Sequence, residues 1–156
     1  MKKKITSQLR IVFVLLVTLF LNLSCSLLDK DTRQETSNIP ATYGDRPVEV
    51  QGTINVSSKE VTFKTWDSGQ IDGDIITLVV DGKVILSNYS LLGTKKSIAV
   101  TLDNLGYNYV MLYAHNEGSI SPNTAALSVT DKAGNEKELV LSANLSTNAA
   151  YNIVVQ

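Results

Sequence analysis

Apolar and polar residues alternate with a period of two along most of the chain after Val48. Successive side chains of a β-strand point to opposite faces of the sheet, so this pattern predicts strands with one buried and one solvated face. The stretches that predict strands are 53–57, 61–66, 83–86, 97–102, 107–114, 124–130, 138–143 and 151–155. No long segment after residue 25 has the helical period of 3.6, which indicates an all-β domain.

One further run is apolar without interruption. Residues 75–80 predict a central strand that is covered on both faces. Asp81-Gly82 follows at once, and these residue types tolerate the positive φ angles that a type I′ hairpin turn needs. Eight or nine short strands separated by turn residues predict an antiparallel β-sandwich over residues 48–156, and immunoglobulin-like and jelly-roll topologies both fit.

The N-terminus has a different pattern. Four basic residues within positions 1–10 precede an apolar block at 11–21, which is short for a transmembrane helix. This order is typical of a secretory signal peptide. Cys25 is the only cysteine of the chain, so no disulfide bond within the chain is expected.

Ser24-Cys25, placed directly after the apolar block, resembles the lipobox of bacterial lipoproteins. Asn22 departs from the pattern, because the family usually has Leu at that position. The resemblance implies that residues 1–24 are removed and that Cys25 carries acyl chains such as palmitate. It further implies a membrane anchor through the N-terminal lipid, in the cell envelope and at the outer membrane, on its periplasmic or surface face. Residues 25–47 are rich in polar residues and predict a flexible linker behind the lipidated cysteine.

The charge balance changes when the signal is removed. Four of the fourteen basic residues precede Cys25 and none of the fifteen acidic residues does, which leaves a net charge of about −5. Nucleic-acid binding depends on basic surface, so the mildly acidic mature chain argues against nucleic acid as a partner.

Three aspartates, Asp67, Asp72 and Asp74, precede the apolar run. Two residues apart at the start of a strand, Asp72 and Asp74 point to the same side and repel each other unless water or a cation lies between them. Calcium prefers such oxygen ligands, and a solvated turn of Asp and Gly residues is the alternative.

The segment 71–82 is similar to stretches in small secreted bacterial β-sandwich domains, some of which are calcium-dependent carbohydrate-binding modules. This resemblance implies calcium at Asp72 and Asp74, with sugar hydroxyls completing the ligand shell. A second polar loop, 116–124, contains Asn116, Glu117 and Asn123 as candidate ligand-binding residues, and a plain crossover between sheets is the alternative.

Catalysis is not expected. His115 is the only histidine, and its position beside a polar loop is typical of a solvated side chain. We therefore expect a non-catalytic, membrane-anchored binding module that depends on calcium and is directed to glycans. A structural or assembly lipoprotein that docks on an envelope protein is the alternative, through loops or an edge strand. A small hydrolase ranks third.

Overall fold

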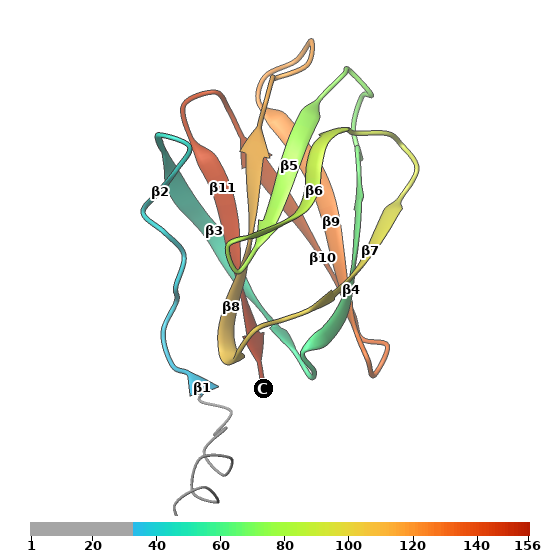
Figure 1. Cartoon of the computed structure of the whole chain (residues 1–156). Coiled ribbons are helices and arrows are strands. Elements are labelled where there is room, and N and C mark those ends of the chain that lie inside the picture. The colour runs from blue at the N-terminus through green and yellow to red at the C-terminus, as the bar shows by residue number, and fades with distance from the viewer. Residues whose placement is uncertain (1–32) are drawn as a thin grey trace, which may run out of the picture. The chain divides into compact units, whose positions relative to one another are not determined.

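The computed structural model describes residues 33–156, which form strands and no helix. Figure 1 shows two layers of strands packed against each other, so the prediction of an all-β, two-sheet fold is confirmed. The strands are β1 (Arg33–Gln34), β2 (Thr42–Tyr43), β3 (Arg46–Val56), β4 (Glu60–Trp66), β5 (Ile75–Val80), β6 (Lys83–Ser90), β7 (Lys96–Thr101), β8 (Leu105–Ala114), β9 (Asn123–Asp131), β10 (Glu136–Ala143) and β11 (Asn148–Val155).

The larger sheet has the strand order β2-β3-β11-β8-β5-β6, with β1 paired to the start of β8. The smaller sheet has the order β10-β9-β4-β7. Most neighbours are antiparallel, but β3 runs parallel to β11 and β1 runs parallel to β8. The two-residue strands β1 and β2 were not among the predicted strands.

The main core lies between the two sheets. Phe63 and Leu127 of the smaller sheet belong to the same buried cluster as Leu78, Leu112 and Ile153 of the larger sheet. All five are fully buried, which stabilises the fold by about 1.5–3 kcal/mol for each side chain. The apolar positions of the period-two pattern therefore supply the side chains that point inward between the two sheets.

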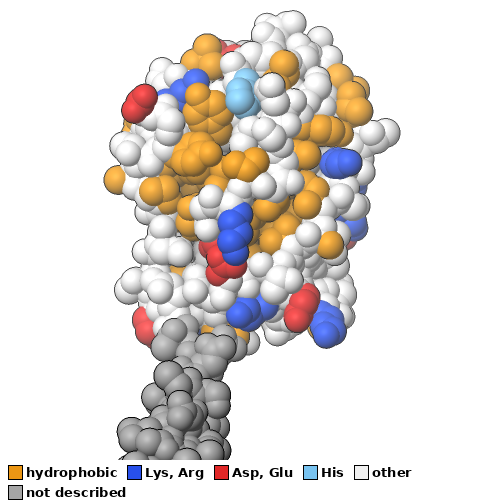
Figure 2. All heavy atoms as spheres, in the orientation of Figure 1, with side chains coloured by type: hydrophobic (Ala, Val, Ile, Leu, Met, Phe, Trp, Pro, Cys, Tyr) orange, Lys and Arg blue, Asp and Glu red, His pale blue; other side chains and the backbone are white. Residues whose placement is uncertain are grey.

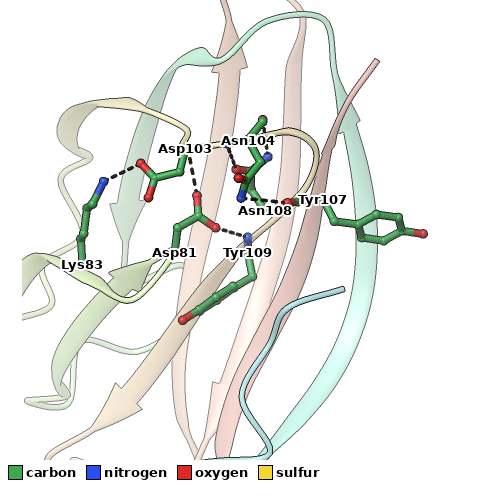
Figure 3. A network of polar contacts seen from close by, with 7 residues as sticks. All are labelled: Asp81, Lys83, Asp103, Asn104, Tyr107, Asn108 and Tyr109. Carbon is green, nitrogen blue, oxygen red and sulfur yellow. Dashed lines mark hydrogen bonds and ion pairs between the residues drawn. The ribbon is translucent and has the colours of Figure 1, made fainter. Parts of the chain in front are cut away.

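The predicted central strand and its hairpin turn are both present. β5 is buried on both faces, and Asp81 and Gly82 have φ angles of 49° and 80°. The Asp81 carboxylate also joins two neighbouring segments, because it accepts hydrogen bonds from the backbone N–H groups of Tyr109 and Asp103 (Figure 3). Asp103 in turn pairs with Lys83.

The outer face of the larger sheet carries a second apolar cluster. Val79, Tyr109, Met111 and Ala150 lie there, and Figure 2 shows apolar side chains gathered in the middle of the face that is turned toward the viewer in Figure 1. Ile39, Tyr43 and Val48 pack against this cluster.

Residues 33–43, which we call the strap, hold β1 and β2 and supply Ile39 and Tyr43 to that apolar cluster. The folded region thus begins before Val48, within the segment that the sequence predicts as linker. The strap needs glycine at residue 106, since a Cβ there would lie 2.2 Å from the carbonyl oxygen of Gln34.

The strands place the connecting segments at two ends of the sandwich. The loop end holds the turn 44–45 and the loops 67–74, 91–95, 115–122 and 144–147. The terminal end holds the turns 57–59, 81–82, 102–104 and 132–135, together with Arg33 and the C-terminal Gln156. The candidate metal residues and the second polar loop of the sequence analysis therefore share one end (Figure 1).

Candidate functional site

A cavity of about 240 Å³ opens at the loop end. It lies between the loop that leaves β4 and the loop that enters β9. Its lining residues are Asp67, Ser68, Gly69, Gln70, Asp72, Asp74, Ile120, Pro122 and Thr124. The three aspartates predicted as metal ligands thus converge on one cavity, and the polar loop 115–122 forms its opposite wall.

Asp67 lies directly after β4 and is only 7% exposed. Its backbone N–H donates to the carbonyl oxygen of Leu92, which ties the start of the loop to the neighbouring connection. Its Oδ1 accepts a hydrogen bond of 2.9 Å from the N–H of Gly69. Its Oδ2 is buried and accepts no hydrogen bond from any described residue. This residue of the cavity wall therefore has one carboxylate oxygen without a hydrogen-bond partner among residues 33–156.

Asp74 lies directly before β5 and is 4% exposed. Its Oδ2 accepts a hydrogen bond of 3.0 Å from the N–H of Thr124, whereas its Oδ1 is buried without a partner in the part of the chain that is described. Burial raises the pKa of this carboxyl group above its ordinary value, and the charges of Asp72, Asp67 and Glu117 raise it further. The Thr124 hydrogen bond partly opposes these effects. The site therefore disfavours the bare carboxylate, and either a proton or a bound cation would relieve this cost.

Asp72 fastens the two loops together. Its Oδ2 accepts hydrogen bonds from the backbone N–H groups of Ser119 and Ile120, at 3.1 and 2.8 Å. Gly118 has a φ angle of 57°, and a Cβ on it would lie 2.4 Å from Asp72 Oδ1. Glycine is therefore required where the second loop passes over the Asp72 side chain.

The three predicted ligand-binding residues do not line the cavity. Asn116 accepts a hydrogen bond from the N–H of Ile75 and donates one to the carbonyl oxygen of Gly73, at 2.7 and 2.8 Å. Asn123 donates to the carbonyl oxygens of Ile75 and Asn116. These side chains fasten the loop 115–122 to the start of β5, so their amides position the cavity wall.

Glu117, the third of these residues, accepts a hydrogen bond of 3.2 Å from the N–H of Leu145 and so connects a further loop to the site. The cavity wall includes residues that the sequence analysis did not select, such as Gln70 and Thr124. Gln70 is an ordinary polar loop residue and Thr124 is the second residue of β9, and only their spatial position marks them.

The arrangement fits a metal ion in part. Residues 33–156 contain no group of three or more His, Cys, Asp or Glu side chains placed to hold a metal ion. The two unpartnered oxygens of Asp67 and Asp74 are nevertheless the hard ligands that calcium prefers, and backbone carbonyls and water commonly complete its shell. Asp67 and Asp74 are therefore the side chains best placed to hold such an ion, and Asp72 adds charge beside them.

Comparison with protein-family models, with curated proteins and with solved structures gives no match for this chain. Cys25 and the predicted signal peptide lie outside the described residues, which include no helix long and apolar enough to span a membrane.

Proposed function

We propose that this chain is a non-catalytic, lipid-anchored protein of the bacterial cell envelope whose β-sandwich binds a ligand at the loop end with the help of calcium. One observation carries the proposal: Asp67 and Asp74 both line the cavity, and each has one buried carboxylate oxygen without a hydrogen-bond partner among the described residues. A buried, unpartnered carboxylate oxygen is unfavourable unless a cation or an ordered water satisfies it.

Calcium suits this cavity because the nearby carboxylates make the electrostatic potential there negative. Asp72 and Glu117 add their charges to those of Asp67 and Asp74. A divalent cation between the two buried carboxylates would offset their mutual repulsion and occupy both unpartnered oxygens. The polar walls at Ser68 and Gln70 suit a ligand rich in hydroxyl groups, so a glycan that completes the ion's shell is the ligand class we favour.

Thermal unfolding of the full chain in detergent tests the metal site. Calcium at one hundred times its Kd should stabilise the folded state by about 2.7 kcal/mol and EDTA should reverse the effect, because the ion binds the folded state preferentially. Asp67→Asn/Asp74→Asn should abolish this response. Asp45→Asn is the matched control, since Asp45 is exposed and does not line the cavity. An unchanged melting temperature and no calorimetric binding heat would contradict the proposal.

The anchor is tested separately. We propose that Cys25 is acylated and that the protein resides at the outer membrane. Cells that express the chain should incorporate an alkyne-labelled palmitate into it, and Cys25→Ser should prevent this. Labelling that persists in the variant, or fractionation of the wild type away from membranes, would contradict the anchor.

We also propose the immunoglobulin-like form of the sandwich rather than the jelly roll. The order β11-β8-β5-β6 corresponds to the G-F-C-C′ order of variable-type immunoglobulin sheets, and β4 pairs with β7 in the opposite sheet as strands B and E do. An experimental structure with a different strand order would contradict this assignment.

A structural or assembly role on an envelope protein is the second candidate. It is supported by β6, which forms one edge of the larger sheet and exposes Val84. An exposed edge strand offers backbone groups to which a partner strand can add. Val84→Lys would then abolish partner co-purification from solubilised envelope and leave the calcium response unchanged, whereas retained co-purification would count against this candidate.

A further inference from the structure

Exposed apolar side chains concentrate at the loop end. Among residues 33–156, seven large apolar side chains are exposed, and four of them lie one on each of the loops 67–74, 91–95, 115–122 and 144–147 at this end. They are Ile71, Leu92, Ile120 and Leu145, with exposed fractions between 47% and 59%. The other three, Val50, Val84 and Val140, lie singly on strands. Single exposed apolar residues are normal, whereas a cluster on converging loops indicates an interaction surface.

Contacts between the loops connect the segments that carry these four residues. The Asp67 N–H bonds to the Leu92 carbonyl oxygen, and a Cβ added to Gly93 would lie 3.1 Å from Ile71 Cδ1. Ile120 itself lines the cavity. Leu145 is tied to the same group of loops, because its N–H donates to Glu117. We call these four side chains the apolar rim.

The charge inside the rim has one sign. Asp67, Asp72 and Asp74 line the cavity, and Glu117 is close enough to affect the pKa of Asp74. None of the described lining residues is lysine or arginine. A calcium ion would neutralise two of these four negative charges, so the surface stays acidic with or without the ion.

We propose that the apolar rim and the acidic cavity form a docking surface for a protein partner that presents apolar side chains beside a lysine or arginine. The inference rests on the loop end as the binding surface of the proposed function and names the class of partner. It does not depend on calcium. The apolar side chains of the partner would cover the rim, and the basic group would lie against Asp72 and Glu117.

Charge argues against two other occupants of this surface. A membrane that contains anionic lipid would repel four clustered acidic groups. A second copy of the chain would bring together two cavities that are each lined by three aspartates and by no lysine or arginine, because a symmetric contact joins the same patch on both subunits. A basic, apolar segment of another protein satisfies both the charge and the exposed side chains.

Selection from a phage-displayed random peptide library tests the docking surface, with the full chain immobilised in detergent. We expect enriched peptides that contain Lys or Arg next to large apolar residues. Ile71→Ser/Ile120→Ser should weaken the affinity of these peptides at least tenfold. Val50→Ser/Val140→Ser is the matched control, because it removes two similarly exposed apolar residues from strands and should leave the affinity unchanged.

Three results would overturn the proposal. One is the absence of enriched peptides, or enriched peptides whose affinity the rim variant does not change. Another is a dimer of the wild type in sedimentation velocity that Ile71→Ser/Ile120→Ser dissociates. The third is membrane insertion of the rim. It would be detected if brominated lipid quenches a fluorophore attached at Ile120→Cys, with the full chain in vesicles of phosphatidylethanolamine and phosphatidylglycerol.

Calcium and EDTA arms separate this proposal from the metal site. Peptide affinity that is lost in the rim variant but is equal with calcium and with EDTA would support docking, even where calcium leaves the melting temperature unchanged. A normal calcium response together with no rim-dependent peptide would support the metal site and overturn the docking surface.

Discussion

Asp74 and Asp131 are buried aspartates at opposite ends of the sandwich, and their carboxylates have different surroundings. At the terminal end, Asp131 accepts hydrogen bonds from the backbone and hydroxyl groups of Ser57 and from the backbone and amide groups of Asn135. These bonds hold its pKa well below the ordinary value. At the loop end, Asp74 has one partnered and one unpartnered oxygen, and its pKa is raised.

Asp81 shows that a raised pKa alone does not distinguish the candidate site from the rest of the fold. Burial raises the pKa of Asp81 as well, although each of its oxygens accepts a backbone hydrogen bond (Figure 3). A raised pKa therefore accompanies burial at a turn that is purely architectural. The unpartnered oxygens of Asp67 and Asp74 are what separate the candidate site from the buried carboxylates of the terminal end.

The largest effect is expected at the terminal end. Asp131→Ala removes every hydrogen bond between the carboxylate and Ser57 or Asn135. The hydrogen bond from the Lys132 N–H to the Ser58 hydroxyl is then the side-chain hydrogen bond left between these two turns. We expect the largest fall in melting temperature, measured by circular dichroism. A smaller fall than in Asp67→Ala would contradict the view that Asp131 is architecture and Asp67 is a site.

The stabilising effect of Asp131 should depend on pH in a defined direction. Its pKa is lowered from 3.8, so its contribution is fully present above that pH and is lost as the pH falls through the lowered pKa. The difference in unfolding free energy between wild type and Asp131→Ala should therefore shrink on acidification below pH 3.8. A difference that stays constant down to the acid transition would contradict the assignment.

A matched pair of glycine variants tests the strap, which begins at the terminal end. Gly106 and Gly134 have φ angles of 79° and 86°, but only a Cβ on Gly106 would meet another residue. Gly134→Ala should cost about 1–2 kcal/mol from backbone strain alone. Gly106→Ala should cost more and should also speed hydrogen exchange in residues 33–43. Equal exchange in the two variants would show that the strap does not need Gly106.

The smallest effect is expected at the loop end without calcium. Asp74→Asn keeps an acceptor for the Thr124 N–H and removes a charge that Asp72 and Asp67 repel. The raised pKa of Asp74 means that its charge destabilises the fold as the pH rises above 3.8. In EDTA at neutral pH, this variant should therefore melt slightly higher than the wild type, with no difference at low pH. A lower melting temperature in EDTA would show that the charge is satisfied within the protein.

Local sequence chemistry determined much of the architecture. The alternation of side chains along a strand is a property of the extended backbone, so the eight period-two segments each predicted a strand, and the apolar run 75–80 predicted a ninth. Asp81-Gly82 predicted its own turn for the same kind of reason, since positive φ depends on residue type. The aspartates 67, 72 and 74 were also visible in the sequence as an unusual local concentration of charge.

Only the tertiary structure decided which of these groups meet. The loops 67–74 and 115–122 share a cavity because β5 pairs with β8, and no local pattern encodes that choice of neighbour. Asn116 and Asn123 look like free ligands in the sequence, yet they bond to Gly73 and Ile75 some forty residues away along the chain. The strap shows the same limit of local sequence. Its polar sequence predicts a linker, whereas in the structure it packs on the sheet where Gly106 leaves room for it. Strand pairing over long separations decides the partners of each polar group, and those partners distinguish the candidate site from the frame that holds it.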